Sequence, residues 1–389
     1  MVRYLPLVWK NSLRNRRRSI LTVLSLAASL CLLGLLLALY HGLFMATPTP
    51  AQALRLITHH KVSLAHLMPV AYRNKIKSLP GVREVMTMQW FGGTYRDARD
   101  PANFFARFAI EPSRLFTIFP EIELPPDEIH TFQTQRTACI AGRDLANKFH
   151  WKPGERITIV GDIFPVTLDL TLVGIFDGDP ANASTLFFNQ DALYEGMPAG
   201  SALKNLAGTF EILAASAADV PRIATEVDAM FQNAPEPTKT ETEQAFQLSF
   251  VSFLGNVKAF LFLIFGAVTF TTLLVSANTI AMSVRERVRE VGILKTLGFT
   301  NGSILGIILG EAAIISLVGG AVGMLLAEGL AAAMRAGPAY LIAVKTLTIG
   351  PGVVGLSLAL AVVIGLISAL IPAANAARTS IIDSLAYSG

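Results

Sequence analysis

The sequence predicts a membrane protein of α-helices that carries a large α/β domain outside the membrane. The chain of 389 residues is 52% hydrophobic and only 15% charged, and its mean hydropathy is +0.51. A soluble domain carries about 25% charged residues, so this composition excludes an ordinary cytosolic enzyme and a disordered chain. The apolar residues gather in four blocks, which leave one long segment of mixed composition between the first block and the second.

Each apolar block is long enough to cross a bilayer, which takes about 20 apolar residues. A segment in lipid must satisfy its backbone polar groups internally, so such runs predict helices. The third block contains one acid, Glu311, and we expect Pro372 to break the fourth block near its end. The first block is too long for the apolar core of a signal peptide, so we expect it to remain as a helix. The predicted spans are 20–40, 258–282, 303–328 and 349–374.

The distribution of lysine and arginine predicts which ends of the spans face the cytoplasm. Residues 1–19 and the loop 283–300 are rich in basic residues, whereas the loop 329–348 carries only two. We therefore expect a multi-pass protein of the cell inner (plasma) membrane whose N-terminus and C-terminal tail, residues 375–389, are cytoplasmic. Residues 41–257 are then periplasmic, or more generally extracytoplasmic. The net charge of +4 reflects this orientation and predicts no nucleic-acid partner.

The first 19 residues combine apolar and basic positions at helical spacing. This pattern predicts an amphipathic helix that lies on the inner membrane surface, with its basic side chains toward anionic headgroups. A simple anchor that sets the orientation of the first span is an equally good interpretation. The apolar positions are Leu5, Val8, Trp9 and Leu13.

The long segment outside the membrane is predicted to be a mixed α/β domain with a strand-rich centre. Residues 156–160 and 167–173 alternate between apolar and polar side chains, as half-buried strands do. The flanking segments, about 58–125 and 205–242, are predicted to fold as strand, helix and strand. We expect the helix of the first flank to cover residues 68–79.

The external segment lacks the motifs of common enzyme and metal sites. The sequence contains no Gly-x-Ser-x-Gly, His-Glu-x-x-His, Cys-x-x-Cys or Gly-x-x-x-x-Gly-Lys run. His59, His60 and His66 lie close together, but no cysteine or acid near them in sequence completes a metal site. Asp177 and Asp179 belong to a turn sequence. We therefore expect neither catalytic residues nor a metal site.

The segment between the second and third spans combines an apolar seam with a charged face. Val284, Val288 and Val291 recur four and three residues apart, and Leu294 continues the series. Arg285 and Arg289 lie four residues apart, as do Glu286 and Glu290, so another face of the segment is charged. This pattern predicts an amphipathic helix that continues from the second span to Gly298, because glycine favours helix ends. A solvated loop that only sets orientation is the alternative, but such a loop has no need of an apolar seam.

This segment and both ends of the membrane region resemble a known family. The run Arg-x-Arg-Val-Arg-Glu-Val-Gly-Ile-Leu-Lys-x-Leu-Gly over residues 285–298 is similar to the signature of FtsX-like, or MacB-type, permeases of type VII ABC transporters. The stretch from Trp9 to Thr22, the glycines that follow Glu311, and residues 371–385 are similar to further parts of these permeases. The external segment resembles theirs in its size and in the order of its lobes.

The resemblance implies a permease subunit with four spanning helices and a MacB-like periplasmic core domain. A porter lobe would cover about 58–130 and 205–245, and a sabre lobe about 131–203. The chain itself would not be an enzyme and would bind no cofactor. A second permease copy or a paralogue would complete a dimer, and two copies of a separate cytoplasmic ABC ATPase would hold ATP and Mg. A periplasmic adaptor, an outer-membrane channel and membrane lipids are further partners that the resemblance implies.

The function that the resemblance implies is the transmission of mechanical work across the membrane. ATP hydrolysis on the partner would change the conformation of the external domain and drive export or extraction of a lipophilic or periplasmic cargo. One alternative is a regulatory mechanotransmitter that controls a periplasmic enzyme such as a cell-wall hydrolase. Another is a membrane-anchored receptor domain without ATP coupling.

Two sets of site residues follow from this interpretation. The residues expected to couple the chain to the ATPase are Val284, Arg285, Glu286, Arg287, Val288, Arg289, Glu290, Val291, Gly292, Leu294, Lys295 and Gly298. The residues expected to pack helices in the membrane, within one chain or between two subunits, are Gly306, Gly310, Glu311, Gly319 and Gly323.

Overall fold

The chain folds into two compact units, each with its own core. The computed structural model describes residues 16–45, 48–178, 182–253, 256–335 and 348–380. The first, fourth and fifth of these ranges form a membrane unit, and the second and third form an external unit. The predicted surface helix of the first 15 residues, most of the loop 329–348 and most of the C-terminal tail lie outside the described residues.

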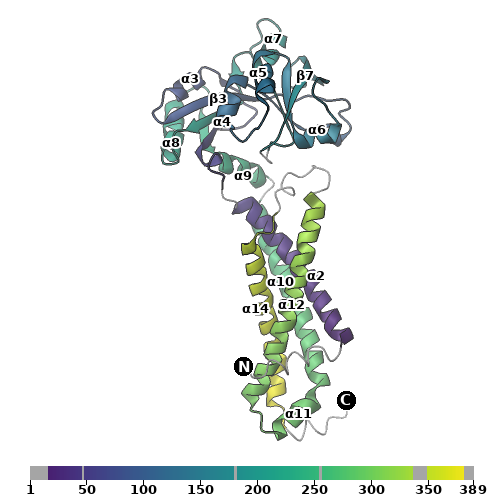
Figure 1. The fold of residues 1–389 in the computed structure, drawn as a ribbon. Coiled ribbons are helices and arrows are strands. Elements are labelled where there is room, and N and C mark those ends of the chain that lie inside the picture. The colour runs from purple at the N-terminus through teal and green to yellow at the C-terminus, as the bar shows by residue number, and fades with distance from the viewer. Residues whose placement is uncertain (1–15, 46–47, 179–181, 254–255, 336–347, 381–389) are drawn as a thin grey trace. The chain divides into compact units, whose positions relative to one another are not determined.

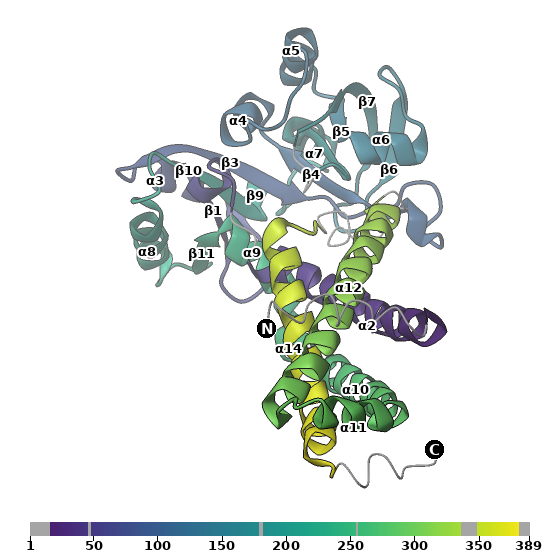
Figure 2. The same ribbon diagram turned by 60° about the horizontal axis from the view of Figure 1, so that its bottom comes forward.

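The membrane unit is built from long apolar helices that run side by side (Figure 1). Within the described part of the chain, four helices are long and apolar enough to cross a membrane. A short helix, α11, lies against α10, α12 and α14, and Figure 2 shows it from the end of the bundle. Together with the α/β external unit, these helices confirm the predicted fold class. The helices are α2 (Arg16–Phe44), α10 (Val257–Glu286), α11 (Val288–Thr296), α12 (Asn301–Arg335) and α14 (Pro351–Arg378).

Small residues let α12 approach its neighbours closely. A Cβ atom added at Gly323 would lie 2.7 Å from the carbonyl oxygen of Ala27 in α2, and one added at Gly319 would lie 2.9 Å from Cβ of Leu26. Close backbone approach of this kind is a common mode of packing for membrane helices. Gly319 and Gly323 therefore pack helices within one chain. Gly306 and Gly310 are half-buried in α12, and their use between subunits stays a prediction.

The fourth span continues past its proline, so the expected break at Pro372 is wrong. Helix α14 runs to Arg378 with Pro372 inside it. Residues on both sides of the proline are buried, among them Ala369, Ala373 and Ala377. Packing by neighbouring helices holds such a helix together although the proline removes one backbone hydrogen bond.

The external unit is organised around a mixed sheet of nine strands in the order β11-β1-β10-β3-β4-β8-β5-β7-β6. The pairs β4–β8 and β5–β7 are parallel, and the other neighbours are antiparallel. A separate pair, β2 and β9, completes the described strands. The strands are β1 (Arg55–His60), β2 (Met68–Pro69), β3 (Val82–Trp90), β4 (Ala106–Ile110), β5 (Ala138–Gly142), β6 (Arg156–Val160), β7 (Thr167–Phe176), β8 (Thr185–Asn189), β9 (Leu206–Ala207), β10 (Thr209–Ala214) and β11 (Thr238–Thr242).

Helices cover both faces of this sheet and create three apolar cores. One core joins α3 and α8 to β1, β3 and β10, a second joins α4 and α5 to the centre of the sheet, and a third joins α6 and α7 to β5–β8. Strand β8 is buried on both faces, which explains why all five of its residues are inaccessible. The helices are α3 (Tyr72–Lys77), α4 (Pro112–Ile118), α5 (Pro126–Thr134), α6 (Arg143–Phe149), α7 (Gln190–Gly196), α8 (Val220–Phe231) and α9 (Glu243–Phe253), with short 3-10 turns at Gln52–Leu54 and Pro101–Asn103.

The strand predictions for the centre of this unit are confirmed, and one helix prediction needs correction. Strand β6 covers the predicted residues 156–160, and β7 extends the second predicted strand to Phe176. The helix expected over 68–79 is shorter, because Met68 and Pro69 pair with β9 and the helix covers only Tyr72–Lys77. A residue before proline prefers an extended backbone, which favours the strand at Met68.

Candidate functional site: the helix between the second and third spans

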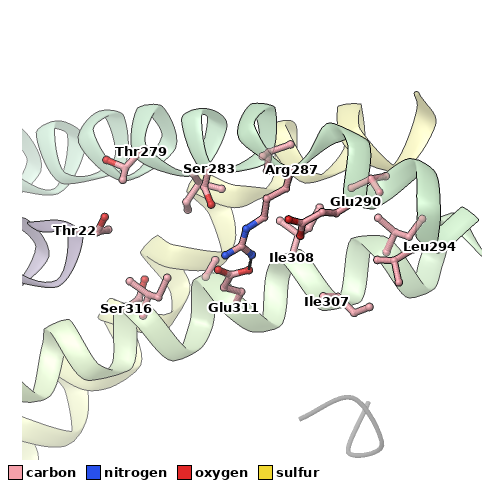
Figure 3. A pocket seen from close by; sticks show the side chains of 16 residues that line it. Thr22, Thr279, Ser283, Arg287, Glu290, Leu294, Ile307, Ile308, Glu311 and Ser316 are labelled. Carbon is pink, nitrogen blue, oxygen red and sulfur yellow. Dashed lines mark hydrogen bonds and ion pairs between the residues drawn. The ribbon is translucent and has the colours of Figure 1, made fainter. Parts of the chain in front are cut away.

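The segment between the second and third spans is divided into two helices at Arg287. Helix α10 ends at Glu286, Arg287 has non-helical angles of φ −110° and ψ 10°, and α11 begins at Val288. The expectation of one uninterrupted helix from the second span to Gly298 is therefore wrong. The break occurs at the residue whose side chain turns toward α12 (Figure 3).

The break residue is tied to the third span by an ion pair. Nη1 of Arg287 donates to Oε2 of Glu311 at 2.6 Å. The two side chains are only 15% and 11% exposed. An ionised group in an apolar environment is costly unless it is paired, so this contact explains how the third span accommodates its acid. Glu311 thus has a defined structural partner, which the sequence alone did not identify.

A small cavity surrounds this ion pair and is enclosed by α2, α10, α11 and α12. Its volume is about 70 Å³, and Figure 3 shows the side chains that line it. Several members of the predicted apolar seam, Val284, Val291 and Leu294, line this cavity. Much of the seam therefore faces the chain's own helices. The polar side chains in the lining are those of Thr22, Thr279, Ser283, Arg287, Glu290, Glu311 and Ser316.

Helix α11 is fixed to the ends of the third and fourth spans. Val291 is 6% exposed and packs with Ile304 of α12 and Ala377 of α14. Nζ of Lys295 donates to the carbonyl oxygen of Thr379, which caps α14, at 2.5 Å. Val291 is thus buried in its own bundle, and the expectation that it contacts an ATPase stays a prediction.

The C-terminal end of α11 is closed by a glycine in the left-handed conformation. Gly298 has a φ of +88°, its N–H donates to the carbonyl of Lys295, and the N–H of Phe299 donates to the carbonyl of Leu294. These two bonds are those of a Schellman motif, which needs glycine at this position. The predicted stop at Gly298 is confirmed. The next helix follows at once, and the Thr300 hydroxyl accepts from the N–H of Ser303.

Two apolar side chains on α11 and its cap face outward. Ile293 is 48% exposed and Leu297 is 70% exposed. They are four residues apart and therefore on one face of the helix. Sequence reasoning overlooked both, although their i, i+4 spacing marks a second apolar stripe beside the seam. The charged residues Arg285, Glu286 and Arg289 are also exposed, so they and this apolar pair form the accessible part of the predicted coupling segment.

The histidine cluster of the external unit is held by hydrogen bonds. His59 pairs with Glu241 at 3.1 Å, and Nε2 of His60 lies 3.1 Å from a carboxylate oxygen of Glu236. The backbone N–H of Val62 donates to Nδ1 of His60, so the ring proton sits on Nε2 and points to Glu236. The ligand atoms of His60, His66 and Glu236 do lie within 4.8 Å of one another.

The turn at Asp177 forms an ion pair on the surface. Its carboxylate accepts two hydrogen bonds from Arg143, at 3.0 and 2.6 Å. These hydrogen bonds hold the pKa of the Asp177 carboxyl below its usual value. Gly178 follows with a φ of +114°, as a turn requires. Asp177 forms an isolated β-bridge with Glu123. Asp179 and Pro180, which would complete the predicted turn, lie outside the described residues, so the turn stays a prediction.

The membrane helices match a family of permeases. Residues 246–381 match the family described as FtsX-like permease C-terminal. The matched region contains α10, α11, α12 and α14, and hence the whole site around Arg287 and Glu311 except Thr22.

Individual relatives support this match. An uncharacterized ABC transporter permease of Methanocaldococcus jannaschii is 24% identical over 348 residues, which are 84% of this chain and 83% of that protein. The uncharacterized ABC transporter permease YknZ of Bacillus subtilis is 34% identical, over 34% of each chain. The macrolide export ATP-binding/permease protein MacB of Chromobacterium violaceum is 35% identical over 28% of this chain, but over only 16% of its own length.

Solved structures are similar to the chain over about half of its length. The periplasmic region of MacB from Actinobacillus actinomycetemcomitans is 7% identical, with a TM-score of 0.36, and covers 51% of this chain and 92% of that chain. The extracellular domain of YknZ from Gram-positive bacteria is 15% identical, with a TM-score of 0.35, and covers 48% of this chain and 99% of that chain. The family match over the membrane helices and the relative aligned over 84% of the chain show that this protein is similar to FtsX-like permeases of ABC transporters.

Proposed function

We propose that this chain couples ATP hydrolysis on a separate cytoplasmic ABC ATPase to a change in its external unit. The proposal rests on the two sides of α11. The side that faces the bundle is held by contacts with the chain's own helices, and the other side exposes apolar side chains. Val291 and Lys295 fix the helix to α12 and α14, while Ile293 and Leu297 remain exposed. An exposed apolar pair with charged neighbours suits a small protein interface, in which an apolar centre is surrounded by a polar rim.

The anchoring determines what a push on α11 would do. A partner that displaces the helix must also move α12, because the Arg287–Glu311 ion pair and the Val291 contacts link the two. Lys295 transmits the same displacement to the end of α14. Long helices resist bending, so motion at one end of a span reaches the other end. Closure of two ATPase subunits would in this way drive the external units of a permease dimer.

The direction of this signal follows from the predicted orientation. We place α11 and both chain termini in the cytoplasm, at the inner (plasma) membrane, and the external unit in the periplasm or outside the cell. MacB is described as a macrolide export protein that carries its own ATP-binding part. For this chain we propose export or extraction of a lipophilic or periplasmic cargo, without a catalytic role of its own and with an adaptor and outer-membrane channel as further partners.

Co-purification tests the docking role of the exposed pair. The tagged full chain is purified from its native membrane, and ABC ATPases are identified and quantified by mass spectrometry. The double substitution Ile293→Asp with Leu297→Asp should reduce the bound ATPase at least tenfold and remove its stimulation by the permease. Val62→Asp is the matched control, because Val62 is an exposed valine of the external unit. Recovery of no ABC ATPase with the wild-type chain, or undiminished recovery with the double variant, contradicts the proposal.

A further inference from the structure

The external unit contains a large apolar pocket that the coupling function does not use. Its volume is about 700 Å³, within the range of pockets that hold small molecules. It lies beside β1, β3 and β10 and is bounded by α9 and by the loop after β1. Six of its apolar lining residues are Ile57, Leu67, Met88, Trp90, Phe108 and Phe246.

One buried acceptor in the lining has no hydrogen-bond partner among the residues that the structure describes. Gln89 is 5% exposed, and its Nε2 donates to the carbonyl oxygen of Trp90 at 2.8 Å. That bond fixes the orientation of the amide, so the other atom, Oε1, is a buried acceptor without a partner. A buried polar atom that lacks a partner costs about 1–3 kcal/mol. A bound molecule with an N–H or O–H group would remove this cost.

The charged groups near the pocket argue against an anionic ligand. The described lining contains two acids, Glu211 and Glu243, and no lysine or arginine. Arg55 is not among the lining residues and is ion-paired with Glu243, which is one of them, at 2.6 Å and with Glu121 at 2.5 Å. Burial, together with the nearby Glu243 carboxylate, raises the pKa of Glu211 to about 8. The burial that disfavours the ionised form of Glu211 also disfavours a negative charge on a ligand, and Arg55 is already paired with Glu243 and Glu121.

We infer that this pocket binds a compact lipophilic molecule that carries an N–H or O–H donor and no negative charge. The apolar and aromatic side chains hold its body, and Oε1 of Gln89 accepts its donor. The rim is open to such a molecule, since Leu64 and Ile163 are 40% and 55% exposed. The site belongs to the external unit alone, so this inference does not depend on ATP coupling.

A matched pair of probes tests the inference on the full chain in lipid nanodiscs. We would use 5-fluoroindole and 5-fluorobenzofuran, which share one shape and differ in a single N–H donor. Fluorine NMR line broadening gives the affinity after subtraction of the signal from empty nanodiscs. The wild-type chain should bind the indole about tenfold more tightly, because one satisfied hydrogen bond of about 1.4 kcal/mol corresponds to that factor.

Three variants separate the pocket from general partition into lipid. Gln89→Met should bring the two affinities together, and Ala65→Trp, at an exposed lining position, should weaken both probes. Ala217→Trp is the matched control, because Ala217 is equally exposed but lies outside the lining. Equal affinities of the two probes for the wild-type chain, or unchanged binding by Ala65→Trp, overturns the inference. If Gln89→Met does not fold, these two results still decide the question.

Discussion

Arg287, the residue at which the second span ends, donates to the carboxylate of Glu311, the acid of the third span, at 2.6 Å. The break between α10 and α11 therefore lies in direct contact with the acid of the third span. It fixes the start of α11 to α12, while Val291 and Lys295 fix the rest of the helix. The pair therefore controls how firmly the exposed end of the segment is attached to the bundle.

Glu311→Gln should destabilise the membrane unit and weaken coupling. Neutralisation of Glu311 removes one ion pair of the mostly buried Arg287, and the loss of one partner of a buried pair costs up to about 3–5 kcal/mol. Thermal unfolding in detergent measures this loss. Arg335→Ala breaks an ion pair with Glu328 whose side chains are 30% and 49% exposed, and should cost about 0–1 kcal/mol. Similar losses for the two variants would show that the Arg287 contact has no special role.

Alanine substitutions at two glycines of α12 should have opposite effects. Gly323→Ala places a methyl group 2.7 Å from the Ala27 carbonyl oxygen, so α2 must move away and the melting temperature should fall. Gly329→Ala meets no atom of the described residues within 4 Å and should stabilise the helix by about 1 kcal/mol, because alanine favours helices. Thermal unfolding of the full chain compares them. Dissociation of a dimer by Gly323→Ala without loss of stability would instead place this glycine between subunits.

The stability of the external unit should decrease as the pH rises toward 8. Burial and the Glu243 carboxylate raise the pKa of Glu211 from 4.5 to about 8, while Arg55 and the Thr209 hydroxyl oppose the shift. Between these values the folded state binds the proton more tightly than the unfolded state, so the free energy of unfolding falls with increasing pH. Glu211→Gln removes this dependence and should raise the melting temperature at pH 8 by about 2–4 °C.

The control for Glu211 is an exposed glutamate. Glu155→Gln changes an acid on the surface and should leave the pH dependence as it is in the wild-type chain. Melting curves from pH 5 to pH 8, recorded for all three proteins, make the comparison. A Glu211→Gln curve that runs parallel to the wild-type curve would mean that Glu211 is ionised in the folded state.

Cys139 should resist thiol reagents until the external unit unfolds. Its side chain is 0% exposed within a core, and burial raises the pKa of the thiol. A thiol that is neither ionised nor accessible does not react. Labelling with N-ethylmaleimide in a Cys31→Ala background, followed by mass spectrometry, checks this. Rapid labelling of the folded chain would contradict the packing of β5.

The sequence predicted those features that depend on local pattern. Strands β6 and β7 followed from alternation, the four spans from apolar length, and the end of α11 from Gly298. Features that depend on contacts between distant segments were not accessible in this way. The pairing of Arg287 with Glu311 joins residues 24 positions apart, and no periodicity encodes it.

The apolar seam shows where pattern reasoning misleads. The spacing of Val284, Val291 and Leu294 correctly indicates one apolar stripe, but a stripe does not reveal what covers it. The structure covers it with the chain's own helices, and leaves Ile293 and Leu297 exposed. In the same way, Pro372 satisfies the rule for a helix break, yet burial on both of its sides overrides the rule.

The continuity of the nine-stranded sheet has a mechanical consequence. Backbone hydrogen bonds link every neighbour from β11 to β6, and α9 follows directly on β11 at Glu243. A force applied along α9 would act first on the edge strand β11. The hydrogen bonds between neighbouring strands would then transmit it across the sheet to β6. The external unit should then move as one rigid body, because the described strands form one continuous hydrogen-bonded sheet.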